Sequence, residues 1–118
     1  MIQLKRAYDD LSDHDGCRVL VDRIWPRGVS KEKLQLDEWL KEIAPTKELR
    51  QWFDHDPEKF DEFKKRYKKE LEDHQEQVEK LISLAENNDE LTLIFAAKDE
   101  EHNNAVVLKE YLELKMKN

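Results

Sequence analysis

Three stretches of the chain have the apolar pattern of β-strands. Residues 2–8 alternate apolar and polar side chains, which is the period of a strand near a sheet edge with one wetter face. Residues 18–22 contain an unbroken Val-Leu-Val run, and residues 91–97 are almost wholly apolar, as in strands that are buried on both faces. The sequence therefore predicts one strand near a sheet edge and two strands that are largely buried.

Most of the remaining apolar residues recur at intervals of three and four, the spacing of amphipathic helices. Ser30 suits the N-cap of a helix that buries Leu36, Trp39, Leu40 and Ile43 on one face before Pro45 ends it. Ahead of this helix, Pro26 and Gly28 suit the second and fourth positions of a β-turn. Thr46 suits the N-cap of a short helix, and the clearest start is Asp56 with Pro57 at the first helical position.

A long apolar stripe follows, from Phe60 to Ala85. Asp73 and Glu76 have the spacing of a capping box, so the stripe fits either one helix or two. A last helix begins near Glu100 and carries the remaining apolar positions. The order of strand, strand, helices, strand, helix predicts an α/β fold with a small three-stranded, mainly parallel sheet covered by about five helices.

The length and composition favour a single folded domain over residues 1–118. Charged residues make up 42% of the chain, and most of them fall on the outer faces of the predicted helices. The formal net charge of −7 argues against a nucleic-acid partner, because binding to phosphates requires a basic surface. The sequence gives no indication of an oligomeric state.

Cysteine usage and hydropathy favour a cytoplasmic protein. Cys17 is the only cysteine, so no disulfide can form within the chain. No apolar run approaches the roughly 20 residues that a membrane-spanning helix needs, and the first residues lack the apolar centre of a signal peptide. We therefore expect no membrane association.

Polar side chains follow both interior strands at the point where each strand ends. In open α/β sheets, ligands bind beyond the carboxyl ends of the strands, where the connecting loops diverge. If the two strands are neighbours, their loops should form one site. The residues concerned are Asp22, Arg23, Trp25 and Arg27 after the first interior strand, and Lys98, Asp99 and His102 after the second.

The first loop has the residue types of an anion site. The guanidinium groups of Arg23 and Arg27 suit a phosphate or a carboxylate, and Trp25 between them can stack on a ring or a guanidinium. Asp22 can serve as a general base or nucleophile if its surroundings tune its pKa. In the alternative interpretation, the arginines pair with Asp22 and all of these residues are structural.

The second loop adds candidates for substrate binding and for acid/base chemistry. Lys98 would help to hold an anion, and Asp99 with His102 would transfer a proton. Asp99 is equally well placed as the N-cap of the last helix, and His102 then fits a structural role in its first turn.

Motifs for metals and common cofactors are absent from the sequence. The four histidines show no HxxxH or HExxH spacing, and a single cysteine cannot complete a zinc site. There is no P-loop, GxGxxG or GxSxG motif. The sequence therefore predicts no metal site and identifies no cofactor.

Three segments resemble the bacterial DUF488 family, in its YeaO-like branch: VDRIWPRGVSKEKLQLDEWLKEIAP, WFDHDPEKF and LIFAAKDEEHNNAVVL. The resemblance covers nearly the whole chain and implies a compact α/β domain with a parallel core sheet, without assigning a catalytic role to any residue. It adds His55 and Asn103 to the residues of interest. Two positions look like departures, because family members often carry Tyr at Cys17 and His at Asn104. The residues that match the recurring family pattern are Asp22, Arg23, Trp25, Pro26, Arg27, Gly28, Trp39, His55, Pro57, Lys98, Asp99, His102 and Asn103.

The leading hypothesis is a small cytoplasmic enzyme that acts on a phosphorylated or nucleotide-like anionic small molecule. Asp22, Asp99 and His102 would be catalytic, and Arg23, Trp25, Arg27, Lys98 and Asn103 would bind the substrate. The alternative is a non-catalytic module that senses an anionic metabolite or binds a partner through the same residues. A purely structural polar network is the third interpretation.

Overall fold

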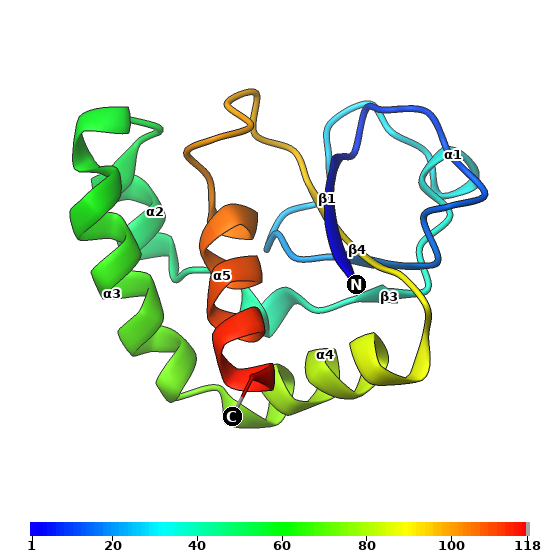
Figure 1. Cartoon of the computed structure of the whole chain (residues 1–118). Coiled ribbons are helices and arrows are strands. Elements are labelled where there is room, and N and C mark those ends of the chain that lie inside the picture. The colour runs from blue at the N-terminus through cyan, green and yellow to red at the C-terminus, as the bar shows by residue number, and fades with distance from the viewer. Residues whose placement is uncertain (118) are drawn as a thin grey trace.

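A parallel four-stranded sheet lies at the centre of the computed structural model, which describes residues 1–117 (Figure 1). The strands are β1 (Ile2–Arg6), β2 (Cys17–Leu20), β3 (Glu38–Trp39) and β4 (Leu91–Phe95), in the spatial order β1-β4-β2-β3. All three pairings are parallel. The α/β class is confirmed, although the sheet has four strands instead of the expected three. β2 and β4 are neighbours, which is the condition for a single site at their ends.

The additional strand lies within the segment that the sequence predicted to be one helix. The helix capped by Ser30 is only one turn long, α1 (Lys31–Leu34), and β3 and the 3₁₀ turn η1 (Lys41–Ile43) follow it. The predicted helix through Ile43 is therefore wrong. The turn before α1 also begins one residue later than predicted, because the amide of Val29 donates to the carbonyl of Pro26 and Gly28 adopts φ 79°.

Pairing with β2 explains why this helix stops early. Gln35 has a left-handed backbone conformation with φ 45°, which ends the helix. The guanidinium of Arg18, from β2, donates two hydrogen bonds to the carbonyl of Leu34, at 3.0 and 2.8 Å. The amide of Asp37 then pairs with the carbonyl of Arg18. A continuing helix would have used those backbone groups internally, so the sheet and the helix compete for this segment.

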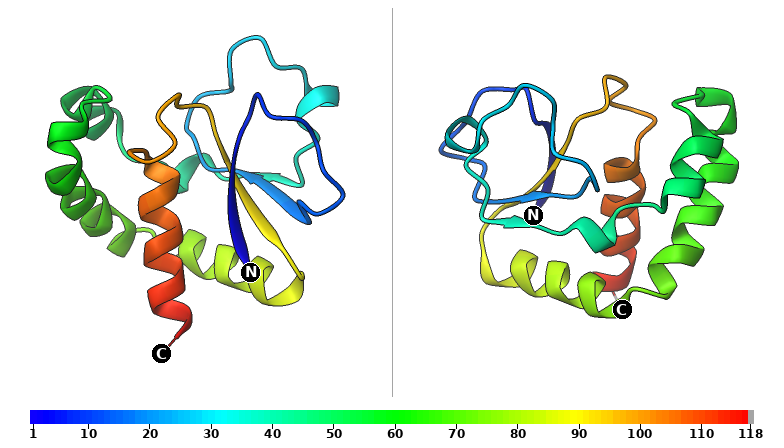
Figure 2. Two further views of the ribbon diagram at one scale, coloured as in Figure 1. Left: turned by 45° about the horizontal axis from the view of Figure 1, so that its top comes forward. Right: turned by 180° about the vertical axis from the view of Figure 1, so that it is seen from behind.

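The longer helices all lie on one side of the sheet, where α5 separates the strands from α3 and α4 runs along one end (Figures 1 and 2). No helix among residues 1–117 has the length and apolar composition needed to cross a membrane. The elements on this side are α2 (Lys47–Phe53), the 3₁₀ turn η2 (Pro57–Lys59), α3 (Phe60–Glu72), α4 (Gln75–Asn87) and α5 (Asn104–Met116).

Several helix boundaries follow the capping residues of the sequence. Thr46 caps α2 through a hydrogen bond from the amide of Leu49, and Asp56 caps η2 with Pro57 in its first turn, as predicted. The long apolar stripe is divided into α3 and α4, but His74 occupies the N-cap of α4 without a side-chain bond, so no capping box forms. The prediction that Asp99 caps the last helix is wrong, because Asn103 does so.

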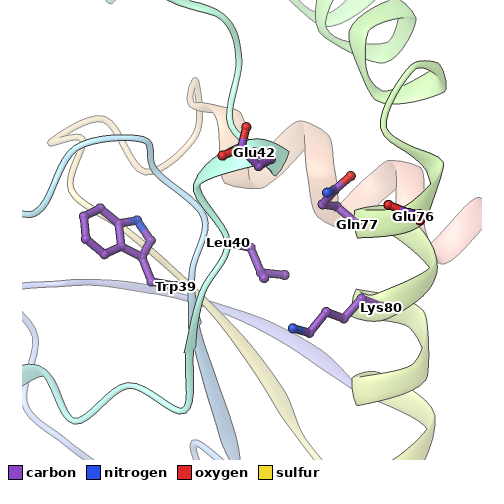
Figure 3. Close-up of a pocket in the computed structure, with 6 residues that line it drawn as sticks. All are labelled: Trp39, Leu40, Glu42, Glu76, Gln77 and Lys80. Atoms are coloured by element: carbon purple, nitrogen blue, oxygen red, sulfur yellow. The ribbon is translucent and has the colours of Figure 1, made fainter.

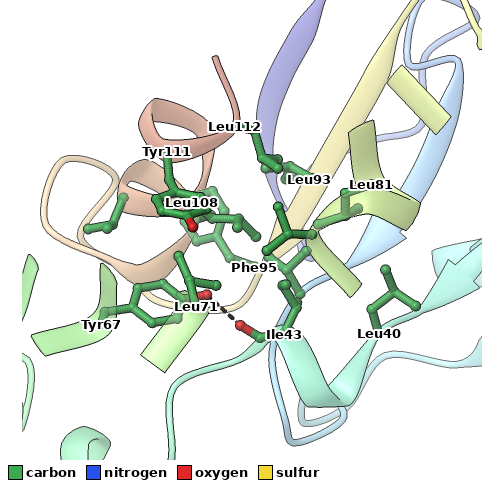
Figure 4. Close-up of a cluster of buried hydrophobic side chains, with 14 of the residues drawn as sticks. Leu40, Ile43, Tyr67, Leu71, Leu81, Leu93, Phe95, Leu108, Tyr111 and Leu112 are labelled. Carbon is green, nitrogen blue, oxygen red and sulfur yellow. Dashed lines mark hydrogen bonds between the residues drawn. The ribbon is translucent and has the colours of Figure 1, made fainter. Parts of the chain in front are cut away.

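Alternate residues of the interior strands supply two separate cores. Val19, Val21, Leu93 and Phe95 point toward the helices and join the larger core, part of which Figure 4 shows. Burying each large apolar side chain contributes about 1.5–3 kcal/mol, so this core is the main source of stability. The opposite face carries a smaller core under loops and α1. Its members are Ala7, Leu20, Val29, Leu34 and Ile94, with Trp25, Leu36 and Trp39 packed against them.

Candidate functional site

The carboxylate of Asp22 joins the ends of the two interior strands to the start of α5. Its Oδ2 accepts a hydrogen bond from the amide of Ala96, just beyond β4, at 2.9 Å. Its Oδ1 accepts one from Nδ2 of Asn104 at 3.1 Å, and the same amide group donates to the carbonyl of Val21. The predicted convergence of the two strand ends therefore takes place at Asp22.

Burial and neighbouring groups shift the pKa of Asp22 in opposite directions. Burial raises the pKa of its carboxyl group, whereas the two hydrogen bonds and the positive charges of Arg50 and His55 lower it. The burial effect is larger, so the pKa lies above its usual value. A half-buried carboxylate with a raised pKa and cationic neighbours is the kind of group found at functional sites.

Two arginines beside Asp22 have incomplete hydrogen bonding. Arg23 donates from Nη2 to the carbonyl of Ala44 at 3.1 Å, and its Nη1 lies 3.9 Å from Glu42, a distant ion pair. Its Nε is buried without a hydrogen-bond partner among residues 1–117, and the Nε of Arg50 is in the same situation. Buried donors without acceptors are costly, so both guanidinium groups keep unused hydrogen-bonding capacity.

His55 reaches this region through an unusual backbone turn. Asp54 and His55 are consecutive residues with positive φ angles, of 45° and 56°. Aspartate tolerates this left-handed conformation better than most residues, but two in succession are uncommon. The turn leaves His55 exposed, with its ring centroid 6.4 Å from that of Phe53. Strained backbone of this kind concentrates at ligand sites, which favours a role for His55.

A buried tyrosine underlies these groups. The hydroxyl of Tyr67 donates to the carbonyl of Ile43 at 2.6 Å, and the residue is fully buried. Burial first, and then the negative charge of Asp22, raise its pKa well above the usual value, while Arg23 acts in the opposite direction. Tyr67 thus stays neutral beneath the site. We refer to Asp22, Arg23, Arg50, His55 and Asn104 as the Asp22 cluster.

A second polar unit precedes α5. Oδ2 of Asp99 lies 2.9 Å from Nδ1 of His102, while Oδ1 accepts hydrogen bonds from the amides of Glu101 and His102 at 2.9 and 3.0 Å. Hydrogen bonding, from the amide of Glu101 first, lowers the pKa of Asp99 below its usual value. The ring of His102 meets the ring of Phe60 edge to face at 5.1 Å. Asp99 therefore orients His102 against α3.

The side chain of Asn103 forms hydrogen bonds with the backbone at the start of α5. Its Oδ1 accepts from the amide of Val106 at 3.0 Å and its Nδ2 donates to the carbonyl of Asp99 at 2.8 Å. The residue is only 2% exposed. These contacts account for an asparagine at this position by structure alone. A role of Asn103 in substrate binding stays a prediction.

The structure separates Trp25 and Arg27 from the Asp22 cluster. Trp25 donates from Nε1 to the carbonyl of Val29 at 2.6 Å and meets Trp39 edge to face at 5.3 Å, within the smaller core on the far side of the sheet. The guanidinium of Arg27 is exposed and forms no hydrogen bond or ion pair with any residue in the described range. Lys98 is exposed as well. Their functional roles stay predictions, but no common pocket unites them.

Two hollows of the surface lie away from the Asp22 cluster. One of about 360 Å³ lies between the β3 edge and α4, beside the ion pair of Lys80 with Glu38 at 2.7 Å (Figure 3). It is lined by Trp39, Leu40, Glu42, Glu76, Gln77 and Lys80. The other, of about 400 Å³, adjoins the loop before β2 and includes Asp15 and Arg18. Neither is lined by residues of the Asp22 cluster.

The residues that complete the Asp22 cluster were only partly visible in the sequence. His55 and Asn104 were marked by the family resemblance, Asn104 as a departure from it. Arg50 had no signal at all, because it occurs within the amphipathic pattern of α2. Its position opposite a strand end depends on how α2 packs. Within residues 1–117, no group of three or more histidine, cysteine, aspartate or glutamate side chains is placed to hold a metal ion.

The comparisons with known proteins agree with one another on the family. The family described as "Inactive DUF488-N3 subclade" matches residues 1–118. The uncharacterised protein YeaO of Escherichia coli K12 is 43% identical over 111 residues, which cover 94% of this chain and 96% of YeaO. An uncharacterised protein of Mycobacterium tuberculosis H37Rv is 51% identical over 72 residues, or 61% of each chain. No solved structure matches significantly.

Proposed function

Because the chain belongs to the DUF488 family, within the group described as its inactive DUF488-N3 subclade, we propose that it is a non-catalytic binding protein for a small anionic molecule. The Asp22 cluster is the proposed binding site. This is the alternative that the sequence offered beside an enzyme. A sensing or regulatory role follows if binding of the anion changes how the protein binds a partner.

The observation that carries this proposal is the pair of guanidinium groups beside Asp22. The Nε atoms of Arg23 and Arg50 are buried and lack acceptors, and the nearest carboxylate to Arg23, that of Glu42, is 3.9 Å away and largely exposed. The cluster contains two guanidinium groups and one carboxylate. Guanidinium groups bind oxyanions through strong charge-assisted hydrogen bonds, so a bound anion would supply the acceptors that are missing.

Asp22 and Asn104 support binding without catalysis. Each oxygen of the Asp22 carboxylate already accepts a hydrogen bond from a neighbour that stays in place, Ala96 or Asn104. The side-chain amide of Asn104 can orient a group but cannot exchange protons near neutral pH. At this position the family resemblance leads us to expect a histidine, which could exchange them. The replacement fits the description of an inactive subclade.

Anion binding is tested by thermal stabilisation and calorimetric titration with inorganic phosphate. Arg50→Gln should weaken the affinity about tenfold or more, because a hydrogen bond to a charged group is worth about 1.5–3 kcal/mol. Arg27→Gln is the matched control, since it removes an exposed arginine outside the cluster and should leave the affinity unchanged. Wild-type protein that shows no response to phosphate would contradict the proposal.

Asp99 and His102 favour a second candidate function, an enzyme acting on a phosphorylated or nucleotide-like molecule. Oδ2 of Asp99 contacts Nδ1 of His102 at 2.9 Å, which leaves Nε2 to give or take a proton. Hydrolysis of p-nitrophenyl phosphate that disappears in His102→Gln would support this candidate. No hydrolysis by the wild type, or equal hydrolysis by the variant, would rule against it.

The expected setting of this function is the cytoplasm. Cys17, the only cysteine, is buried and cannot form a disulfide within the chain. A small molecule is a better candidate than nucleic acid, because the net charge is −7. We therefore propose a cytoplasmic setting and a small-molecule ligand.

A further inference from the structure

The Asp22 cluster contains a carboxylate among cations, which is unexpected for a site that only attracts anions. Asp22 lies within the electrostatic influence of Arg50 and His55, and it directly precedes Arg23 in the chain. A negative charge at this place repels any fully deprotonated anion that approaches the guanidinium groups. The carboxylate of Asp22 is therefore either structural only or contributes to ligand selectivity.

The hydrogen bonds of Asp22 leave room for the second role. A carboxylate has about four acceptor positions, and each oxygen of Asp22 uses one, for Ala96 and for Asn104. No arginine, lysine or histidine nitrogen in the described chain lies within salt-bridge distance of Asp22, so it is not neutralised by a direct ion pair. It can still accept a hydrogen bond from a ligand.

We infer that the Asp22 cluster selects an oxyanion that carries its own hydroxyl hydrogen, of which hydrogen phosphate is the simplest, and discriminates against sulfate. This inference rests on the anion-binding function proposed above. The guanidinium groups of Arg23 and Arg50 would hold the deprotonated oxygens. The hydroxyl would donate to the carboxylate of Asp22, forming a charge-assisted O–H···O⁻ bond.

The same geometry penalises sulfate. Near neutral pH, sulfate has the size and charge of hydrogen phosphate but carries no hydrogen. An oxygen of sulfate placed against Asp22 would meet a like charge instead of an acceptor, and unpaired buried charge is strongly unfavourable. The amides of Ala96 and Asn104 both donate to Asp22, which offsets part of the effect by which burial raises its pKa. Selectivity would therefore arise from repulsion as much as from attraction.

Two pairs of anions test this inference on the wild-type protein. Phosphate and arsenate both retain a hydroxyl hydrogen at about pH 8, whereas sulfate and selenate do not; a higher pH also shifts Asp22 toward its ionised form. Calorimetric titration at constant ionic strength should show phosphate and arsenate binding at least tenfold more tightly than sulfate and selenate. Sulfate affinity equal to that of phosphate would overturn the selectivity and leave anion binding intact. If none of the four anions binds, both proposals fail.

A variant assigns the selectivity to Asp22. In Asp22→Asn, the side chain gains a hydrogen-bond donor and loses its charge, so the preference for phosphate over sulfate should fall to within about threefold. Asp54→Asn is the matched control, because Asp54 is exposed and its left-handed backbone suits asparagine. It should keep the wild-type preference. A folded Asp22→Asn protein that still prefers phosphate tenfold would overturn the role of Asp22. If that variant does not fold, the wild-type comparison decides.

Discussion

Asn104 donates a hydrogen bond from its side-chain amide to the carboxylate of Asp22, at 3.1 Å, across 82 positions of the chain. The contact links the first residue of α5 to the loop that follows β2. The same Nδ2 reaches the carbonyl of Val21. A single amide group thus fixes both the position of the helix and the orientation of the buried carboxylate in the proposed site.

Removal of this amide should destabilise the protein. In Asn104→Ala, the half-buried carboxylate of Asp22 loses one of its two donors, which should lower the free energy of unfolding by about 1–2 kcal/mol. Chemical denaturation measures the change. Asn87→Ala is a suitable control, because Asn87 is exposed at the end of α4 and makes only a long 3.3 Å contact. Equal losses in the two variants would contradict the role of Asn104.

Asp22 should make the folded state less favourable as the pH rises. Burial raises the pKa of Asp22 above its usual value of 3.8, so the folded state holds this proton more tightly than the unfolded state does. Between the usual and the raised pKa, the contribution of Asp22 to stability therefore declines with increasing pH. The free energy of unfolding of wild type minus that of Asp22→Asn should fall through this range. A difference that is constant or rises with pH would contradict the burial of Asp22.

Asp15 should show the opposite pH dependence. Burial alone raises the pKa of Asp15, but hydrogen bonds from Lys5, Ser12 and Arg18 and the charge of Lys5 outweigh it, so the pKa lies below its usual value of 3.8. Its stabilising contribution is thus complete above that value and is lost as the pH falls through the lowered pKa. Asp15→Asn should remove part of the acid sensitivity measured by denaturation, whereas Asp13→Asn, at an exposed position nearby, should not.

At higher pH, Asp15→Asn should also lower the stability strongly. Nη1 of Arg18 lies 2.6 Å from Oδ2 of Asp15, and both residues are almost fully buried, at 6% and 5% exposure. Breaking a buried ion pair by removing one partner costs about 3–5 kcal/mol, because the other charge is left uncompensated. A loss below about 1 kcal/mol would show that Arg18 finds another partner.

Tyr67 should contribute through its hydroxyl as well as its ring. Tyr67→Phe removes the donor to the carbonyl of Ile43 and leaves that buried acceptor unpaired, which should lower the free energy of unfolding by about 1–3 kcal/mol (Figure 4). Tyr8→Phe is the matched control, since the hydroxyl of Tyr8 binds the carbonyl of Arg27 at the exposed surface. Urea denaturation of the two variants should differ clearly; similar values would mean that water replaces the bond in Tyr67→Phe.

The candidate site was predictable where its residues directly follow a strand. Asp22 and Arg23 come immediately after β2, and the end of β4 lies beside them because the two strands pair in parallel. Trp25 and Arg27 were grouped with them for the same reason. The packing of Trp25 on Trp39 places Trp25 in the smaller core on the other face of the sheet instead, and the side chain of Arg27 is exposed. Proximity in sequence to a strand end therefore does not predict on which face of the sheet a loop residue lies.

Sequence alone determined the elements whose signals are local. Continuous apolar runs mark the two interior strands, and apolar residues three and four apart mark the helical stretch that contains α3 and α4. Thr46 and Asp56 mark helix starts by satisfying free backbone amides. Tertiary structure decided the segment 35–43, whose apolar spacing fits a helix as well as an edge strand, because the backbone of β2 and the guanidinium of Arg18 offered it partners that only folding brings near. It also decided the composition of the Asp22 cluster: Arg50 and His55 come from α2 and the turn after it, Asn104 comes from α5, and only the packing of these two helices brings them near the half-buried carboxylate.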